Sequence, residues 1–335
     1  MNPFKKDGQL LPLASINSVY VDNTKASELF RIAVLIKILE KNREQLGFSR
    51  ALSGESLLYR FNDAICSDIP TIKSKTLEIA NDFGDRLASV IKTLKKPSLL
   101  SVENRDNWTD EHWDYWKSIR KLYLVGGLTS PILTKIFYQR IEKAIHDNKI
   151  ADFTVTFIEG SSNLGTKGLS TLCDNGDYLL FDFGQTNIKR AHYMKRNNFI
   201  VLDSVLSSVK SDYLFYKYQS DEELKIIAKS LHSYIKSIII RTCKETDFTG
   251  KNIFMGIANY IHNGTIYSAR GGYGKLAYLS DNYQKLLSSD LSIKLGREIK
   301  VTLHHDTSAM ALNFTEKKNA AVISLGTAFG VAFVD

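Results

Sequence analysis

We expect an α/β fold because short apolar segments of strand length alternate with segments of helical periodicity from about residue 121 to the C-terminus. Several of the apolar segments end directly in glycine-containing turns, as strands that lead into helices or hairpins commonly do. No repeat of fixed period and no low-complexity linker interrupts the chain. Together these features predict two mixed sheets with helices between their strands.

The first third of the chain is predicted to be mainly helical. Residues 9–22 have the composition of an extended hairpin, and apolar residues then recur every three or four positions. Pro97 ends the longest of these periodic segments, and three tryptophans in the last one favour a packed helix over a ligand platform. The predicted helices span residues 26–41, 54–61, 71–96 and 108–116.

The rest of the chain supplies the predicted sheets. Strands are expected at residues 121–125, 153–158, 178–183, 188–193, 253–259, 300–303, 320–325 and 330–334. Helices are expected at residues 130–146, 164–172, 220–241 and 308–314, and residues 173–177 are a turn by composition.

Composition excludes several classes of protein. Hydrophobic residues make up 44% of the 335 residues and charged residues 24%, which excludes a disordered chain. No apolar run reaches the roughly 18 residues of a membrane span, and the N-terminus lacks a secretory signal. Cys66, Cys173 and Cys243 are too few and too far apart for a disulfide framework or a metal cluster. A cytoplasmic protein without membrane contact is therefore expected.

The formal charge of +8 favours anionic partners, but the basic residues are scattered along the chain. A mildly basic, solvated surface is the simplest interpretation, and no nucleic-acid partner is expected. A nucleic-acid binder stays an alternative that rests on this charge alone, and salt-dependent DNA retention without a nucleotide effect would favour it.

Two strand–turn–strand segments have the character of phosphate-binding hairpins. In YLLFDFGQTNIKRAHY (178–193), Asp182 precedes a turn with Gly184 and Thr186; such turns aim N–H groups and a hydroxyl at a phosphate. The leading carboxylate can hold Mg²⁺, usually through water. AAVISLGTAFGVAFVD (320–335) repeats the pattern with Gly326 and Thr327. Either segment alone is equally compatible with a plain hairpin, but two opposed hairpins can clamp one nucleotide from both sides.

Two further segments end a strand in residues suited to ligands. KLYLVGGLTSPIL (121–133) runs into Gly126 and Gly127, where a base or ribose can approach the backbone, although an ordinary strand-to-helix turn is the simpler interpretation. KVTLHHDTSAMAL (300–312) delivers Asp306 to the carboxyl end of a strand, where ligands of α/β sheets bind. Asp306 fits a general base acting on a hydroxyl, and it equally fits a helix N-cap.

The four segments together resemble the glucokinase-like ROK family of sugar kinases, in the actin/hexokinase/Hsp70 ATPase superfamily. DFGQTNIK resembles the first phosphate motif D-x-G-G-T-x, and SLGTAFG resembles the second, L-G-T-G-x-G. LVGG resembles the adenosine motif, and HHDTSAMAL resembles N-D-A-N-A-A-A-L, which holds the catalytic aspartate. Looser similarities in residues 52–61, 153–172 and 254–266 extend the resemblance over most of the chain.

The motifs occur in a rotated order. The family runs from the first phosphate motif through the catalytic aspartate and second phosphate motif to the adenosine motif, whereas here the adenosine motif comes first. This order indicates a circular permutation in which residues 173–177 join the former ends. It predicts that Met1 and Asp335 lie near each other and that residues 9–15 and 331–335 are neighbouring strands.

The resemblance implies a two-lobed actin-like ATPase (ribonuclease H-like) fold, with one lobe of residues 1–160 plus 307–335 and another of residues 161–306. It implies transfer of the ATP γ-phosphoryl group to a sugar hydroxyl. Asp306 would be the catalytic base, and Asp182 would position magnesium through water. The implied nucleotide contacts are Gly184, Gln185, Thr186, Asn187, Gly326, Thr327, Gly126 and Gly127. The implied sugar contacts are His305 and Asn259, and Lys189 is a weaker candidate for a phosphate contact.

Some positions depart from the family pattern. Gln185 and Ala328 replace motif glycines, and His305 replaces the asparagine before the catalytic aspartate. Nothing matches the E-x-G-H or cysteine-rich zinc motif, so no structural zinc is expected. A catalytically weak or inactive ATP- or sugar-binding regulatory protein of the same fold is therefore the alternative. The acceptor stays open among an aldohexose, an N-acetylated amino sugar and another polyol, and a homodimer is an open expectation because the family often dimerises.

Overall fold

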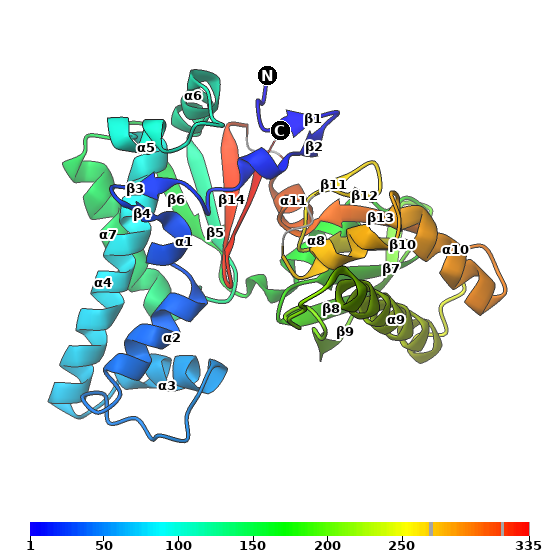
Figure 1. Cartoon of the computed structure of the whole chain (residues 1–335), viewed down its shortest axis with the longest axis horizontal. Coiled ribbons are helices and arrows are strands. Elements are labelled where there is room, and N and C mark those ends of the chain that lie inside the picture. The colour runs from blue at the N-terminus through cyan, green and yellow to red at the C-terminus, as the bar shows by residue number, and fades with distance from the viewer. Residues whose placement is uncertain (268–270, 316–317, 335) are drawn as a thin grey trace.

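The structure is a computed structural model that describes residues 1–267, 271–315 and 318–334 (Figure 1). Within this part of the chain, two main sheets combine parallel and antiparallel pairing. The five-stranded sheet has the order β13-β10-β7-β8-β9, and the four-stranded sheet has the order β15-β14-β5-β6. The predicted α/β class, with two mixed sheets, is confirmed.

The five-stranded sheet begins with an antiparallel meander and continues with two parallel strands on its other side. Helices α9 and α10 precede the two parallel strands, and side chains of both helices join the buried cluster beneath the sheet. The elements are β7 (Gly176–Phe183), β8 (Asn187–Arg196), β9 (Phe199–Lys210), α9 (Asp221–Glu245), β10 (Asn252–Ile257), α10 (Tyr283–Leu295) and β13 (Lys300–His305). The short elements β11 (Ile261–His262), β12 (Thr265–Ile266) and η3 (Tyr273–Tyr278) lie between β10 and α10.

The four-stranded sheet takes strands from both halves of the chain. β14 (Ala320–Leu325) and β15 (Phe329–Val334) form a hairpin, β5 (Lys121–Val125) pairs parallel with β14, and β6 (Thr154–Phe157) pairs parallel with β5. The helices on this side of the molecule are α1 (Ala26–Leu29), α2 (Ile32–Lys41), α3 (Glu55–Ile65), α4 (Pro70–Lys95), α5 (Leu99–Glu103), α6 (Asp110–Ser118) and α7 (Pro131–Asp147).

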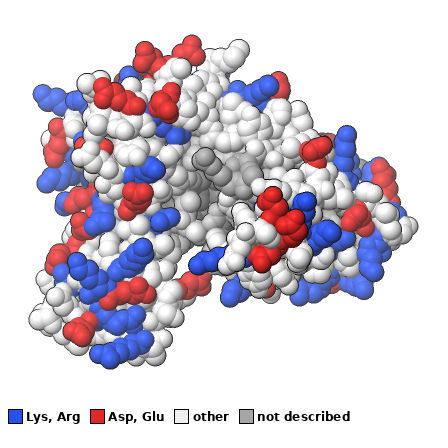
Figure 2. Space-filling model, viewed as in Figure 1, with Lys and Arg blue, Asp and Glu red and all other residues white. Residues whose placement is uncertain are grey.

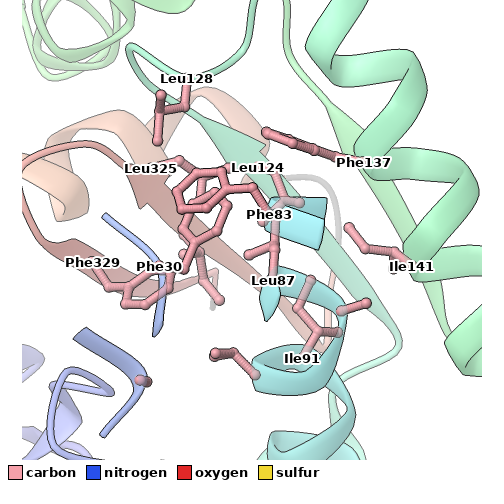
Figure 3. Close-up of a cluster of buried hydrophobic side chains, with 14 of the residues drawn as sticks. Phe30, Phe83, Leu87, Ile91, Leu124, Leu128, Phe137, Ile141, Leu325 and Phe329 are labelled. Carbon is pink, nitrogen blue, oxygen red and sulfur yellow. The ribbon is translucent and has the colours of Figure 1, made fainter. Parts of the chain in front are cut away.

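An aromatic core joins these helices to the four-stranded sheet (Figure 3). Phe30 stacks on Phe83 of α4 with ring centroids 4.2 Å apart, and it also stacks on Phe329 at 5.8 Å. Leu325 and Phe137 belong to the same buried cluster. The ends of β14 and β15 nearest the turn at residues 326–328 are therefore anchored in a dense core.

Two short helices connect the sheets. α8 (Leu164–Ser170) contacts β7 and β10, and α11 (Asp306–Ala311) contacts strands of both sheets. The two helices cross so closely that a Cβ at Gly168 would overlap the carbonyl oxygen of Ala309. Short 3₁₀ segments accompany them at Ser161–Asn163 and Leu312–Phe314.

Most predicted elements are confirmed to within a few residues. The predicted helix over 26–41 is wrong in one respect: it is broken between α1 and α2, where Phe30 and Arg31 are extended. The sequence pattern does not predict β9, whose side chains are largely exposed, or α10, which buries only a narrow stripe of Tyr283, Leu287 and Leu291.

The N-terminal segment differs from the prediction. Residues 9–15 do not pair with β15: β2 (Gln9–Leu10) pairs with β1 (Lys5–Lys6), and a 3₁₀ turn follows at Pro12–Ala14, where proline cannot donate to a ladder. The hairpin of β3 (Tyr20–Val21) and β4 (Thr24–Lys25) follows. Contacts with β15 run instead through side chains: Asn17 bonds both the N–H (3.0 Å) and the carbonyl (2.8 Å) of Phe329.

The two ends of the chain approach each other. Phe4 stacks on Phe333 with centroids 5.1 Å apart, and the Lys5 ammonium donates to the Phe333 carbonyl at 3.4 Å. Asp335, which was predicted to lie near Met1, is outside the described residues.

Acidic and basic side chains are intermixed over the face of the molecule shown in Figure 2. No helix in the described residues combines the length and the apolar character needed to cross a membrane.

Candidate active site

Strand register places several of the predicted site residues on one edge of the five-stranded sheet. Asp182 of β7 is level with Gly256 of β10, which is level with His304 of β13. Asp306 follows His305 at the end of β13, and Asn259 lies two residues beyond β10. This edge is the carboxyl end of three parallel strands, the usual ligand side of such a sheet.

Asp182 is almost fully buried, with 1% of its side chain exposed. Burial raises the pKa of its carboxyl to about 6, and the Lys189 ammonium, 3.3 Å from Oδ2, opposes that rise. Oδ1 has no hydrogen-bond partner among the described residues. Gly165 of α8 leaves room for this carboxylate, because a Cβ there would lie 2.8 Å from Asp182 Cγ.

Asp306 is the first residue of α11, and His305 is the N-cap. The alternative that Asp306 caps the helix is therefore wrong, because the Ser308 N–H donates to His305 Nδ1 at 3.3 Å. Asp306 Oδ1 instead accepts from the Thr307 N–H at 2.6 Å and from the Thr307 hydroxyl at 3.2 Å. Burial raises the pKa of Asp306 to about 6.

The bond from Ser308 also fixes the tautomer of His305. Because Nδ1 accepts, the neutral ring carries its proton on Nε2, which lies 3.4 Å from Asp306 Oδ1. Tyr260 stacks on the ring with centroids 4.8 Å apart, and burial lowers the pKa of His305 to about 3. The histidine is thus neutral at physiological pH and held against the carboxylate from two sides.

Residues 184–186 form the loop between β7 and β8. The Gly184 carbonyl accepts from the Ser211 hydroxyl at 2.7 Å and from the Tyr273 hydroxyl at 3.0 Å. The Thr186 carbonyl accepts from the Ser211 N–H at 2.9 Å. Neighbouring segments therefore hold the carbonyls of Gly184 and Thr186, and this fixes the loop backbone next to Asp182.

The two glycine turns of the four-stranded sheet meet. Gly126 follows β5 with φ of 109°, and a Cβ there would lie 2.7 Å from the carbonyl oxygen of Leu325. The Leu128 N–H donates to that same oxygen at 3.3 Å. Gly326 follows immediately, and a Cβ on it would have no heavy atom within 4 Å, so this turn borders open space.

Two contacts join the edges of the two sheets. Ser161 accepts from the Gly126 N–H at 3.0 Å and leads within four residues to Gly165, which lies against Asp182. Gly330 of β15 lies directly against the Thr307 side chain, next to Asp306. The glycine turns of one sheet and the carboxylates of the other are therefore linked through a few residues of the 3₁₀ segment Ser161–Asn163, α8 and α11.

The donor set suits magnesium better than a transition metal. No group of three or more histidine, cysteine or acidic side chains that could hold a metal occurs in the described ranges. Asp182 nevertheless offers a buried carboxylate oxygen without a partner in the described structure. Mg²⁺ commonly binds through one or two carboxylates, waters and substrate phosphates, so the residues present fit that ion.

A cavity of about 240 Å³ lies between α11 and the N-terminal hairpin of β1 and β2. His305, Ser308 and Phe333 line it together with Lys5 and Gln9 of the N-terminal hairpin. None of the glycine turns and neither carboxylate lines this cavity, so it adjoins the candidate site without containing it.

Two residues of the site, Lys189 and Tyr260, have roles that differ from the sequence-based expectation or lie outside it. The sequence favours an exposed strand position for Lys189, but this residue is the register partner of Asp182 across the hairpin. The predicted strands 178–183 and 188–193 leave four residues between them, which places residues 182 and 189 opposite each other, so this opposite-charge pair could be found from the sequence. Nothing in the sequence indicated that Tyr260 would stack on His305.

No family model and no curated protein sequence matches the chain. Two solved structures show some likeness. An exopolyphosphatase from Cytophaga hutchinsonii ATCC 33406 has 14% sequence identity and a TM-score of 0.28, over 52% of this chain and 50% of that chain. An exopolyphosphatase-like protein has 11% identity and a TM-score of 0.31, over 69% and 87%. The chain thus spans half the length of the first.

Proposed function

We propose that the chain transfers the γ-phosphoryl group of ATP to a hydroxyl of a sugar and is a circularly permuted sugar kinase of the ROK type. The observation that carries the proposal is the pair of buried carboxylates, Asp182 and Asp306, on one sheet edge. Both have pKa values raised to about 6, and glycine turns of a second sheet adjoin them. Perturbed carboxylates gathered at the ligand edge of a sheet are typical of catalytic sites.

The sheet topology supports the proposed two-lobed fold. The five-stranded sheet places a glycine-turn hairpin, β7–β8, beside two parallel strands, β10 and β13. The four-stranded sheet repeats this arrangement with the hairpin β14–β15 beside the parallel strands β5 and β6. The helices that follow the last strand of each set, α11 and α8, pack on each other. Two such related units facing one cleft are what the resemblance implies.

The same comparison supports the permutation. If the chain ends were joined, β14 and β15 would precede β5 and β6, just as β7 and β8 precede β10 and β13. The ends are close enough for such a joint, because Phe4 stacks on Phe333. Only residues 171–175 separate α8 from β7, as expected for the place where former ends were fused. The lobe boundaries that we propose remain 1–160 plus 307–335 and 161–306.

In the proposed reaction, Asp306 accepts the proton of the attacking hydroxyl. A carboxyl with a pKa of about 6 is mainly ionised at neutral pH and is a stronger base than an exposed aspartate. The Thr307 N–H and hydroxyl hold Oδ1, so Oδ2, which has no hydrogen bond within the described residues, is free to take the proton. The bond with Ser308 holds His305 Nδ1, and Nε2 lies 3.4 Å from Asp306 Oδ1, so we propose that His305 positions Asp306 by packing beside it rather than by contacting the sugar.

The nucleotide would lie across the two glycine turns. Gly126 and Gly127 would contact the adenosine, residues 326–327 and 184–187 would contact the phosphates, and Lys189 would move between Asp182 and a phosphate oxygen. Asp182 would hold magnesium through water, and the bound ion would neutralise the charge of the phosphates. Asn259 stays a proposed sugar contact by its position beyond β10.

The experiment is ADP formation from MgATP over a panel of hexoses, amino sugars and other polyols, with Asp306→Ala as the variant. Acceptor-dependent ADP formation that disappears in the variant supports the kinase and identifies its acceptor class. ADP formed equally without acceptor indicates hydrolysis instead. Nucleotide binding without turnover on any acceptor favours the regulatory alternative, for which the departures at Gln185 and Ala328 give the motive.

A further inference from the structure

Helix periodicity continues through residues 29–33, yet the chain breaks the helix there. Phe30 has φ of −140° and ψ of 109°, and Arg31 has φ of −169° and ψ of 164°, so both residues are extended. Phe30 is buried between Phe83 and Phe329, which fixes the backbone at the break. The extended pair brings the start of α2 to the edge of the four-stranded sheet.

The break meets both glycine turns. The Ile32 N–H, which a continuous helix would use internally, donates to the Gly326 carbonyl at 3.0 Å. The Ile32 side chain also approaches the other turn, because a Cβ on Gly127 would lie 3.9 Å from its Cδ1. Arg31 is therefore the residue next to the point where the two turns and α2 converge.

No contact within the described structure accounts for the position of the Arg31 side chain. It is half-buried, and its Nε is buried without a hydrogen-bond partner. Within the described residues its guanidinium makes no ion pair and no hydrogen bond, and the side chain contributes no cap to α2. Buried donors are nearly always paired in folded proteins, so an unpaired one beside a functional turn indicates a missing partner.

We propose that Arg31 binds the phosphate chain of the nucleotide at the turn of residues 326–327. This inference rests on the proposed function. A guanidinium is always charged and matches phosphate oxygens with paired donors, so it suits a polyphosphate better than any other side chain.

The charge pattern of the site supports this assignment. On the five-stranded sheet, the Lys189 ammonium lies 3.3 Å from the Asp182 carboxylate, so the negative charge of Asp182 offsets the positive charge of Lys189. A bound MgATP complex would remain anionic, and its phosphates would lie near two carboxylates. Arg31 supplies positive charge from the opposite sheet, where Gly326 leaves open space.

The test compares nucleotide affinities by calorimetry for the wild type, Arg31→Gln and Arg31→Lys. Arg31→Gln lowers the affinity for MgATP and MgADP about tenfold or more, because a charge-assisted contact is lost. Affinity for adenosine, which has no phosphate, stays within about twofold of the wild type. Arg31→Lys keeps the charge and recovers part of the affinity.

Lys37→Gln is the matched control, because it removes the same charge from an exposed position of the same helix. It leaves all affinities unchanged, and the thermal midpoints of the Arg31 variants stay close to the wild type because no cap is lost. Wild-type affinity for MgATP in Arg31→Gln overturns this inference alone. A wild-type protein that binds no adenine nucleotide overturns the proposed function and this inference together.

Discussion

Replacing Lys189 by methionine tests how the site controls the ionisation of Asp182. The two side chains are register partners on β7 and β8, with Nζ 3.3 Å from Oδ2. Methionine has a similar length and keeps the strand packing, but it removes the only opposing influence that holds the pKa of the buried carboxyl down to about 6.

The size of the effect follows from the contact. An opposite charge at this distance lowers a carboxyl pKa by about 1–3 units, so removing it raises the Asp182 pKa from about 6 to about 7 or above. At pH 7 the ionised fraction of Asp182 then falls from about nine-tenths to about half or less. If ionised Asp182 is needed, turnover near neutrality falls by at least about twofold through this effect alone.

The assay is the pH profile of kcat/KM for acceptor-dependent ADP formation. Lys189→Met moves the acid limb upward by about one unit or more, whereas Lys189→Arg, which keeps the charge, leaves it near its original position. A defect that persists at pH 9 reports an additional contact of Lys189 with phosphate.

Lys195→Met is the control for this series. Lys195 lies on the same strand, and its ammonium bonds the Cys173 carbonyl at 3.4 Å, away from Asp182. The control leaves the acid limb in place. An acid limb that stays unchanged in Lys189→Met would refute the argument that this ammonium sets the charge state of Asp182.

Three further outcomes are expected. In thermal unfolding, Asp306→Asn raises the free energy of unfolding at pH 8 by up to about 3 kcal/mol, and this gain vanishes near pH 4. The reason is that the pKa of Asp306 is raised in the folded state, so that its ionised form destabilises the fold above about pH 6; equal gains at both pH values would contradict this. Gly326→Ala leaves the thermal midpoint unchanged, because its Cβ meets open space, but it weakens MgATP binding several-fold in calorimetry. Undiminished binding would show that this turn does not contact the phosphates. Gly165→Ala forces a Cβ to within 2.8 Å of Asp182 Cγ, so it lowers the free energy of unfolding in denaturant by about 1–3 kcal/mol and removes most of the turnover. A variant with the stability and rate of the wild type would show that Asp182 can shift without consequence.

The larger strands and helices could be predicted because their burial follows the sequence pattern. β7 and β14 are buried apolar runs, and the long helices α4 and α9 carry clear apolar stripes. β9 escaped prediction because this edge strand buries little on either face, so its pattern contains no signal that separates it from a loop.

The break before α2 could not be predicted, since it depends on a tertiary contact. Leu29, Ile32 and Ala33 continue the helical spacing, and the break is compensated by the bond from Ile32 to Gly326, almost 300 residues away. The same holds for the N-terminal segment, where the Asn17 side chain, rather than a strand of residues 9–15, bonds the backbone of Phe329. Long-range partners of this kind leave no periodic trace in the sequence.

The candidate site was found from its glycine turns and strand ends, but its internal bonding was not. The sequence leaves Asp306 open as a helix cap, and only the structure shows that His305 takes that position and lies beside Asp306. Lys189 could have been recognised from hairpin symmetry, whereas the role of Tyr260 depends on a loop conformation that no local pattern specifies.

The most direct test of phosphoryl transfer follows a radiolabelled γ-phosphate from ATP, with magnesium and the best acceptor of the sugar panel, in the wild type and Asp306→Asn. We expect the label on the acceptor hydroxyl in the wild type and at least about a hundredfold less in the variant, which retains the shape of the side chain but not the base. Label that remains on ATP, or that appears as inorganic phosphate at the same rate in both proteins, would contradict the assignment of Asp306 as the base of a sugar kinase.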